Sequence, residues 1–410
     1  MADDTIYYVA KTGNDSNAGT SLSAPKLTIQ DACDDADAGA RNIVEIIDSG
    51  VYTEEIDIYG NAITVRATGS NKPTISGGDS NQYAFESNVS GNIYQGLTFV
   101  GQTKYPINGM ATAGYNFILS GCVATYPGPQ PIGKSGMAEI HNCRLLATNN
   151  DAINIKGASA TVWINNSFVA SNKAGHPVIE GYSGQATVTA SYCTIVGSGH
   201  ADDSGRFYQL VTKIYKVINC IISGSGDGIN ANESTYNLVH VSGQPFTVWS
   251  TTGSYAGTGR SAGTGEITGD PLFISGSIPG TVDPDVDGSV NLDTQNYALL
   301  VNTPAFNAGQ TFAGVTTDIS ASTRAATPTI GAYEFFEDTP IWATFGTQLQ
   351  GNTSADFTIN QYSNLTANYQ MRSAQNPKQV PFFLGVRGPI SLRKDRAYTL
   401  THSDTATGSA

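Results

Sequence analysis

Charged side chains and cysteine pairs are both scarce in this chain of 410 residues. Lys, Arg, Asp and Glu together make up 13% of the sequence, whereas soluble domains usually carry roughly a quarter. The five cysteines contain no Cys-x-x-Cys pair, so the sequence predicts neither a disulfide framework nor a zinc site. Long helices with solvated, salt-bridged faces are therefore excluded as the main material of the fold.

Positive charge and long apolar runs are also in short supply. The 34 acidic residues outnumber the 21 basic ones, and the formal net charge of -13 repels nucleic acids and anionic membranes. No apolar run is long enough for a membrane span, and the acidic first residues are not followed by the apolar core of a secretion signal. We therefore expect no nucleic-acid partner, no membrane span and no Sec leader, and a surface suited to neutral glycans, cations or a basic partner.

What the chain does contain is a repeat with a period in the twenties. Each repeat contains a similar four-residue segment with a small or apolar residue at its second position, as in Asn142-Cys143-Arg144-Leu145 and Asn219-Cys220-Ile221-Ile222. Apolar residues at alternate positions, with a period too short for most two-helix repeats, predict one coil of a β-solenoid per repeat. These ladder residues are expected to stack in the interior as core filler. They are Leu97, Cys122, Cys143, Ser167, Cys193 and Cys220.

A second apolar position follows each ladder residue after about ten residues and predicts a second strand in every coil. The coil after Cys193 departs from this spacing, which predicts an outward loop of about seven additional residues between Gly197 and Phe207. Insertions on one face of a solenoid commonly carry binding or catalysis. The second-register positions are Ile107, Ile132, Ile153, Val178, Leu210 and Ile229.

Segments at both ends of the repeat carry a family resemblance. Gly13-Asn14-Asp15-Ser16-Asn17-Ala18-Gly19-Thr20 and Gly50-Val51-Tyr52-Thr53-Glu54 lie near the start, and Asp270-Pro271-Leu272-Phe273 and Ile330-Gly331-Ala332-Tyr333-Glu334 lie near the end. These segments resemble the N-terminal cap and the closing segment of pectate-lyase-like right-handed parallel β-helix proteins. The resemblance covers roughly the first 335 residues and implies the fold, whereas function has to be argued from the site.

The expected fold is therefore all-β: a right-handed parallel β-helix solenoid with an N-terminal capping helix and a small β-rich C-terminal module. Helical spacing over residues 27–36 predicts the helix, which would cover the open first coil. After Glu334 the repeat gives way to short segments of alternating apolar and polar residues, which predict the module. The expected boundaries are residues 1–60 for the cap and first coil, 61–335 for the β-helix, and 336–410 for the module, which would serve assembly.

Candidate catalytic residues follow from the same resemblance. Residues 149–155 resemble the Asn-Thr-Asp-Gly segment of polygalacturonases, and Gly175-His176 resembles part of their Gly-His-Gly motif. In that family an aspartate pair lies between the two motifs, whereas here Asp202-Asp203 comes after them, so this mechanism is in doubt. Two carboxyls about 5–10 Å apart can still act as acid and base on a glycosidic bond. The candidates are Asp151, Asp202, Asp203, His200 and Arg206.

Two further sets of residues complete the predicted sites. Acidic and aromatic side chains in the connections between strands are candidates for glycan binding, the tyrosines by stacking on sugar rings. Alternate carboxylates in residues 283–288 resemble a calcium loop, although the twelfth position holds Thr294 instead of Glu. No cofactor is required by this interpretation. The glycan-binding candidates are Tyr126, Tyr182, Tyr208, Glu180 and Asp227, and the calcium candidates are Asp283, Asp285 and Asp287.

These observations leave three functions open. The first is a structural, host-facing virion protein, such as a phage tailspike, fibre or capsid appendage, in a virion or extracellular setting. It would form a homo-oligomer, with a trimer as the expected state, contact other virion proteins and bind a host surface glycan without cleaving it. The second is a polysaccharide lyase or glycoside hydrolase of the pectate-lyase-like superfamily. The third is a secreted bacterial adhesin.

Overall fold

The computed structural model divides the chain into two compact units, Met1–Phe335 and Phe336–Ala410. Within them it describes residues 5–37, 42–77, 82–109, 116–126, 130–132, 136–148, 151–155, 159–171, 178–181, 187–197, 207–209, 215–224, 228–229, 231, 233–241, 245, 247–248, 258–259, 261–273, 299, 303–312, 314–334, 357–359 and 398–400. No helix in these described ranges is long and apolar enough to cross a membrane.

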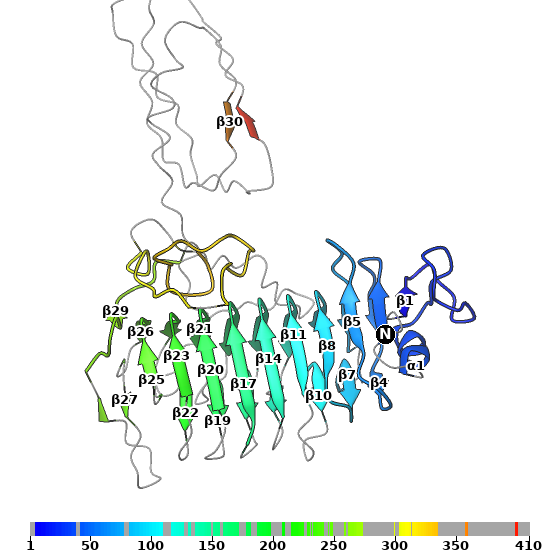
Figure 1. Cartoon of the computed structure of the whole chain (residues 1–410), viewed down its shortest axis with the longest axis horizontal. Helices are drawn as coiled ribbons and strands as arrows, with labels where there is room; N and C mark the ends of the chain where they lie inside the picture. The colour runs from blue at the N-terminus through cyan, green and yellow to red at the C-terminus, as the bar shows by residue number, and fades with distance from the viewer. Residues whose placement is uncertain are drawn as a thin grey trace, which may run out of the picture. The chain divides into compact units, whose positions relative to one another are not determined.

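The first unit is an all-β parallel solenoid, which confirms the predicted fold class (Figure 1). Two ten-stranded parallel sheets run along it. Sheet A contains β1 (Ile6–Val9), β2 (Ile43–Ile46), β5 (Thr64–Ala67), β8 (Asn92–Gln95), β11 (Phe117–Ser120), β14 (Met137–His141), β17 (Thr161–Asn165), β20 (Thr187–Ser191), β23 (Tyr215–Ile218) and β25 (Glu233–Thr235). Sheet B contains β3 (Val51–Thr53), β6 (Thr74–Ser76), β9 (Thr98–Val100), β12 (Val123–Tyr126), β15 (Arg144–Ala147), β18 (Phe168–Ser171), β21 (Thr194–Gly197), β24 (Ile221–Gly224), β26 (Leu238–Val241) and β29 (Ile267–Thr268).

A third lateral face is made of two shorter parallel sheets, and we call it the third face. Its first sheet contains β4 (Ile56–Ile58), β7 (Phe85–Ser87) and β10 (Ile107–Gly109), and its second contains β13 (Gln130–Ile132), β16 (Ile153–Ile155), β19 (Ile179–Gly181) and β22 (Phe207–Gln209). β27 (Thr247–Val248) and β28 (Thr258–Gly259) form a separate antiparallel pair. In the second unit, β30 (Phe357–Ile359) pairs with β31 (Tyr398–Leu400), also antiparallel.

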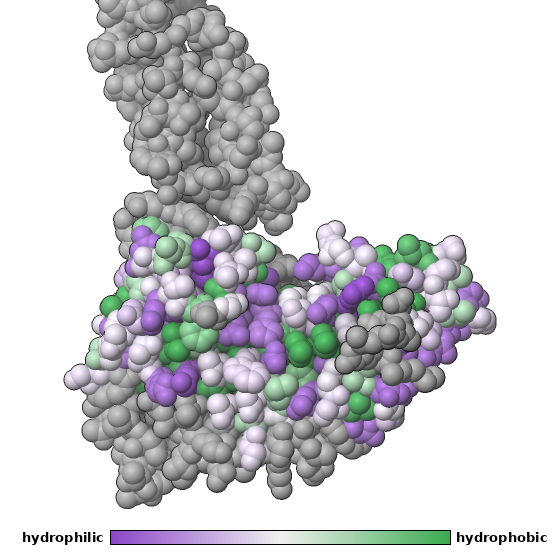
Figure 2. Space-filling view, viewed as in Figure 1, coloured by the Kyte–Doolittle hydropathy of each residue, from purple (hydrophilic) through white to green (hydrophobic). Residues whose placement is uncertain are grey.

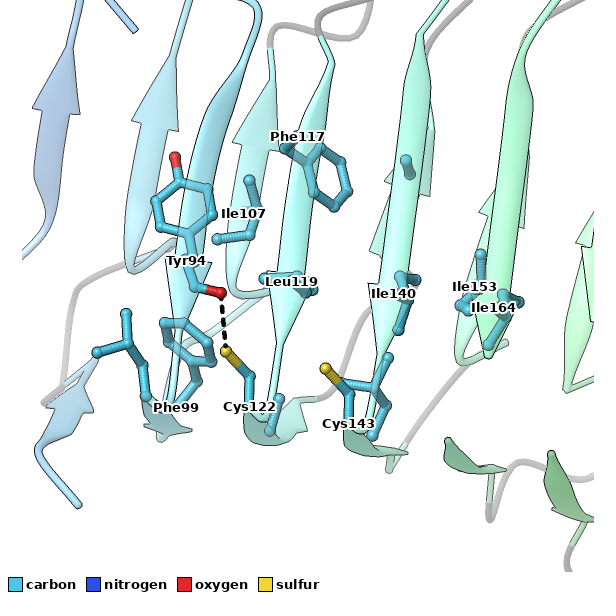
Figure 3. Packing of buried hydrophobic residues seen from close by; sticks show 14 of the residues in the cluster. Tyr94, Phe99, Ile107, Phe117, Leu119, Cys122, Ile140, Cys143, Ile153 and Ile164 are labelled. Carbon is cyan, nitrogen blue, oxygen red and sulfur yellow. Dashed lines mark hydrogen bonds between the residues drawn. The ribbon is translucent and has the colours of Figure 1, made fainter. Parts of the chain in front are cut away.

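Alternation along the strands fills the interior of the solenoid. In β14, Ala138 and Ile140 are buried, while Glu139 and His141 between and after them are partly exposed. The same period of two recurs in the neighbouring strands of sheet A, as expected for a sheet with one face on the core. The buried residues of all three faces form one continuous cluster (Figure 3).

The predicted ladder lies at the corner between sheets A and B, and all six of its residues are fully buried. The corner residue before each is in the left-handed region, with φ of 55° at Asn142 and 63° at Gly121. Glycine and asparagine adopt this conformation at low cost, which explains their recurrence in the repeated segment. The thiols are free, as predicted. Cys122 Sγ donates to the carbonyl of Tyr94, 3.4 Å away (Figure 3).

Hydrogen bonds between coils explain why serine and asparagine can replace cysteine in the ladder. The backbone N–H of Cys143 donates to Ser167 Oγ at 3.2 Å, and that of Cys193 donates to Cys220 Sγ at 3.4 Å. The ladder then continues one coil beyond the sequence prediction, because the Cys220 N–H donates to Asn237 Oδ1 at 2.8 Å. The side chains of Ser167, Cys220 and Asn237 thus each accept a backbone donor that would otherwise be buried without a partner.

The second predicted register is wrong by up to three residues, because Phe207 lies where Leu210 was predicted. Ile153 pairs with Gln130, whereas Ile132 pairs with Ile155. The prediction of about seven extra residues in one outward loop was counted to Leu210, and it is wrong because the strand begins at Phe207, which pairs with Ile179. The connections from sheet B to the third face instead lengthen by two residues per coil. They span residues 127–129, 148–152, 172–178 and 198–206.

A closing segment, residues 303–334, packs on the outer face of sheet B. Ala305, Ile330 and Ala332 join a second apolar cluster with Phe168 and Ile221 of the sheet. Arg324 and Glu334 form an ion pair at 3.2 Å, with side chains only 3% and 0% exposed. The half of sheet B that begins at β15 is therefore covered by a later part of the same chain.

The N-terminal helix, α1, spans Ile29–Asp37 and overlaps the predicted helix. Its apolar side contributes Ile29, Ala32, Cys33 and Ala36 to the main core, against β1, β2 and β4. Glu54 caps the helix, because its two carboxylate oxygens accept the N–H groups of Ile29 and Gln30 at 3.2 and 3.0 Å. Coils begin well before residue 61, since β1 already pairs with β2.

Candidate functional site

Polar residues gather in one row on the outer side of the third face. They occupy the middle position of its three-residue strands, between two residues that point into the core, such as Ile56 and Ile58 on either side of Asp57. Parallel in-register pairing places them side by side on successive coils. In the first sheet the row is Asp57, Glu86 and Asn108. In the second sheet the backbone register places Pro131, Asn154, Glu180 and Tyr208 at the equivalent positions.

Gln130 joins the two sheets of the third face. Its side-chain nitrogen donates to the Ile107 carbonyl at 2.8 Å, and its side-chain oxygen accepts the Ile107 N–H at 3.2 Å. A buried glutamine amide thus stands in for a pair of backbone ladder bonds between β10 and β13. The seam keeps the third face continuous from Asp57 to the later coils.

Asp57 and Glu86 are two carboxyls on adjacent strands, and a third, Glu55, lies close by. Asn108 Nδ2 donates to Glu86 Oε1 at 3.1 Å. Burial, and next to it the negative charges of Asp57 and Glu55, raise the pKa of Glu86 above its ordinary value despite that bond. Neighbouring strands are roughly 4.8 Å apart, which is close to the carboxyl separation of a retaining glycosidase. Burial and the neighbouring charges therefore favour the protonated form of Glu86, which makes it a candidate proton donor in this row.

Aromatic rings flank the carboxyls. Tyr59 is 46% exposed, and burial together with a hydrogen bond to Asp57 raises its pKa to about 12. The rings of Tyr83 and Tyr105 lie 5.0 Å apart between centroids and are tilted by 41°, and Lys104 Nζ donates to the Tyr83 hydroxyl at 3.1 Å. Rings with a polar edge beside carboxylates offer both an apolar face and hydrogen-bonding groups to a ligand.

Three of the predicted site residues are brought together in the second sheet of the third face. Asp151 lies just before β16 and is 1% exposed, and Asn154 Nδ2 donates to Asp151 Oδ2 at 2.8 Å. Asn154 pairs in register with Glu180, which in turn pairs with Tyr208. The backbone thus confirms that these positions are neighbours. Their roles in catalysis and glycan binding stay predictions.

Tyr126 occupies a different environment from the one expected. It is 1% exposed, and its hydroxyl donates to the carbonyl of Ala152 at 2.9 Å. The ring therefore fills the core beside the connection that carries Asp151, and neither of its faces is available to a sugar in this structure. The hydroxyl anchors that connection instead.

The remaining predicted site residues lie outside the part of the chain that the structure describes. They are His200, Asp202, Asp203, Arg206, Tyr182, Asp227, Asp283, Asp285 and Asp287. Within the described part, no group of three or more His, Cys, Asp or Glu side chains is arranged to hold a metal ion. The calcium site therefore stays a prediction.

Sequence reasoning missed Asp57, Glu86 and Tyr59. Their signal was present but weak, because Asp57 and Glu86 each lie in a short strand with an apolar residue on one or both sides and no motif around it, and Tyr59 directly follows β4. The ladder could have located them, since a residue in the middle of the third-face strand recurs once per coil. That inference needed the second register, which the spacing of apolar residues placed wrongly.

Comparisons with known proteins bear on the fold alone. No protein-family model and no curated protein matches the chain. Among solved structures, pectate lyase Pel9A is 15% identical with a TM-score of 0.43, covering 82% of this chain and 98% of that one. A pectin methylesterase from Aspergillus niger is 18% identical with a TM-score of 0.37, covering 64% of this chain and 92% of that one. Both are similar to this chain at a level that carries no inference about its chemistry.

Proposed function

We propose that this protein binds a polysaccharide along the third face of its solenoid. The observation that carries the proposal is the row of Asp57, Glu86 and Asn108, which continues across the Gln130 seam to Asn154. Pro131 interrupts the row in the coil of β13, and Asn108 and Asn154 are 8% and 3% exposed, so Asp57 and Glu86 are the members of the row that present hydrogen-bonding groups to an extended polymer. Tyr59 beside the row is exposed and supplies stacking surface, and the net charge of -13 disfavours a polyanionic ligand.

Binding to defined oligosaccharides tests this proposal. Neutral hexasaccharides and host capsular polysaccharide are titrated by calorimetry into the wild type and into Asp57→Ala and Tyr59→Ala variants. Because each variant removes a group on the third face, we expect a loss of affinity of about tenfold or more, which corresponds to roughly 1.4 kcal/mol. Thr98→Ala, on sheet B, is the matched control and should bind as the wild type does. Equal binding by the wild type and both third-face variants would overturn the proposal.

Cleavage of the bound glycan is a second candidate function, favoured by the pairing of Asp57 with Glu86. With a raised pKa, Glu86 would protonate the leaving oxygen, and Asp57 would attack or stabilise the developing cation. Conversion of Glu86 to Gln keeps size and most hydrogen bonding and removes the proton. An enzyme of this kind would lose reducing-end release by orders of magnitude while keeping its affinity.

The sequence-predicted pair is tested in the same assay. If Asp202 and Asp203 are the acid and base, the double variant Asp202→Asn with Asp203→Asn loses cleavage while Glu86→Gln retains it. The opposite pattern assigns the chemistry to the third-face row. Wild-type protein that releases no reducing ends from any glycan that it binds leaves binding as the function and excludes both assignments.

We also propose where the protein acts: it is a virion or extracellular appendage that assembles as a trimer with other virion proteins. It is motivated by the stiff solenoid and the acidic, glycan-compatible surface. A secreted adhesin would share both features. Sedimentation analysis gives the oligomeric state, and proteomic analysis of purified particles distinguishes a virion component from a secreted protein. A monomer that is absent from particles would overturn this setting and leave the binding proposal intact.

A further inference from the structure

An exposed tryptophan lies in the middle of sheet A, on a different side of the solenoid from the third face. Trp163 of β17 is 36% exposed, whereas Val162 and Ile164 beside it are fully buried. It is one of five large hydrophobic side chains that are exposed among the described residues. Its indole N–H has no hydrogen-bond partner among those residues. Trp163 therefore presents both ring surface and a donor to the solvent.

The neighbours of Trp163 on sheet A are polar. Register pairs place Glu139 on one side and Thr189 on the other. Figure 2 shows hydrophilic residues gathered over the middle strands of this side, with hydrophobic residues over the strands next to them. An apolar peptide side chain on the indole would find no apolar surroundings here, which distinguishes this surface from a protein-protein hot spot.

A hydrogen-bonded chain holds the polar groups beside Trp163 in fixed orientations. Asn165 Nδ2 donates to His141 Nδ1 at 3.3 Å, so His141 carries its proton on Nε2 and donates to Glu139 Oε2 at 3.0 Å. Ser191 Oγ donates to Asn165 Oδ1. The four side chains come from three consecutive strands, β14, β17 and β20, and the register places His141, Asn165 and Ser191 side by side, two residues along from Glu139, Trp163 and Thr189.

Charge on this surface is nearly balanced. Glu139 shares a hydrogen bond with His141 and carries a single negative charge, and Lys216, which follows Thr189 in register, is paired with Glu233 at 2.8 Å. A strongly charged ligand would gain little from such paired groups. The matching ligand has one apolar face for the indole and a polar edge for the amide, imidazole, carboxylate and hydroxyl groups around it. A neutral pyranose ring has both.

We propose that Trp163 is the stacking platform of a second saccharide-binding site, on sheet A, for a neutral pyranose unit. Glu139, Asn165 and Thr189 are the groups that hydrogen-bond the edge of the sugar. The site performs no chemistry and does not depend on the third face. On an elongated protein it gives a polysaccharide a second point of attachment on another side of the solenoid.

The test uses the full chain and a panel of neutral hexasaccharides: cellohexaose, maltohexaose, mannohexaose and xylohexaose. Each is titrated by calorimetry into the wild type and into Trp163→Ala, Trp163→Phe and Tyr59→Ala variants. At least one of these hexasaccharides should bind the wild type. Its affinity should fall about tenfold in Trp163→Ala and be largely preserved in Trp163→Phe. Tyr59→Ala, on the third face, should leave this component of binding unchanged. Saturation-transfer NMR should show the strongest transfer to the ring protons of the sugar that face the indole.

Three results would overturn the proposal. They are the absence of binding to every neutral hexasaccharide at about 1 mM, equal binding by the wild type and Trp163→Ala, and preference for hexagalacturonate over all the neutral sugars at this site. The two sites fail separately. If Tyr59→Ala loses binding and Trp163→Ala does not, the third-face site is supported and the sheet A site is excluded. The reverse result supports only the sheet A site.

Discussion

The guanidinium carbon of Arg324 lies 3.9 Å from the centroid of the Tyr192 ring. Tyr192 is a corner residue with φ of 52°, just before Cys193 of the ladder. Arg324 belongs to the closing segment, and its Nη2 also donates to Asn166 Oδ1, another corner side chain, at 2.7 Å. The corners between sheets A and B therefore serve as docking points for the segment that covers sheet B.

Loss of Arg324 should be among the most destabilising single changes. In Arg324→Met, Glu334 stays buried without its cationic partner, and we expect the free energy of unfolding to fall by about 3–5 kcal/mol. Arg66→Met is the matched control, because the Arg66–Glu45 pair is partly exposed and contributes about 1 kcal/mol or less. Urea unfolding of both variants measures the difference. Equal effects would mean that the closing segment contributes little to the stability of the solenoid.

The thiol column should be inert and intolerant of charge. Burial raises the pKa of Cys143 well above its ordinary value, and all five cysteines are buried, so a thiol reagent should label native protein only on the timescale of unfolding. Cys143→Arg should cost several kcal/mol, because a charge would enter a packed column. Ser167→Cys adds one more thiol to the ladder and should be nearly neutral in thermal unfolding. Rapid labelling of the native wild type would contradict the packing described here.

Glu86 should make stability depend on pH in a defined direction. Its pKa in the folded protein is raised, so the folded state binds the proton more tightly than the unfolded chain does. The stability that this tighter proton binding contributes is fully present below the ordinary pKa of a carboxyl group. It is lost as the pH rises through the raised pKa of Glu86 in the folded protein. Glu86→Gln should therefore match or exceed the wild type in melting temperature at pH 7, with the advantage shrinking toward pH 4. A wild type that gains stability over Glu86→Gln as pH rises would show the opposite linkage.

Removal of the second unit should leave the solenoid folded. The two units separate at Phe335 and Phe336, so a chain that ends at residue 335 keeps sheet A, sheet B, the third face and the closing segment. We expect the melting transition of the truncated chain to fall within a few degrees of that of the full chain. Sedimentation of the two chains tests the predicted role in assembly. A truncated chain with the same oligomeric state as the full chain would exclude residues 336–410 as the assembly module.

The sequence predicted the ladder well because one residue type repeats there for one physical reason. The position between sheets A and B needs a small side chain that can also accept a backbone N–H, and Cys143 and Ser167 both satisfy it. The second register failed because Gln130, a polar residue, occupies a core-facing position as the bridge to Ile107. An apolar pattern cannot reveal a buried glutamine whose amide replaces backbone hydrogen bonds.

The candidate sites were harder to predict than the fold. The carboxyls at Asp57 and Glu86 become neighbours only through a register 29 residues apart, which a search for short motifs does not detect. Tyr126 is predicted to lie in a connection between strands, yet it ends β12, and its hydroxyl reaches the Ala152 carbonyl of the next coil and keeps the ring inside. In a solenoid, the direction in which a side chain points at the end of a strand depends on the coil that follows.

In-register stacking also determines how such a chain can fold. Phe117 pairs with Ala138 and Val162 with Val188, so partners in neighbouring coils are 21 and 26 residues apart. Relative to a unit of 335 residues this is a contact order of about 0.07, a value usual for helical bundles and low for β proteins. Coils can therefore form one after another, each on the template of the last. Arg324, which reaches Asn166 across 158 residues, can fasten the closing segment only after those coils exist.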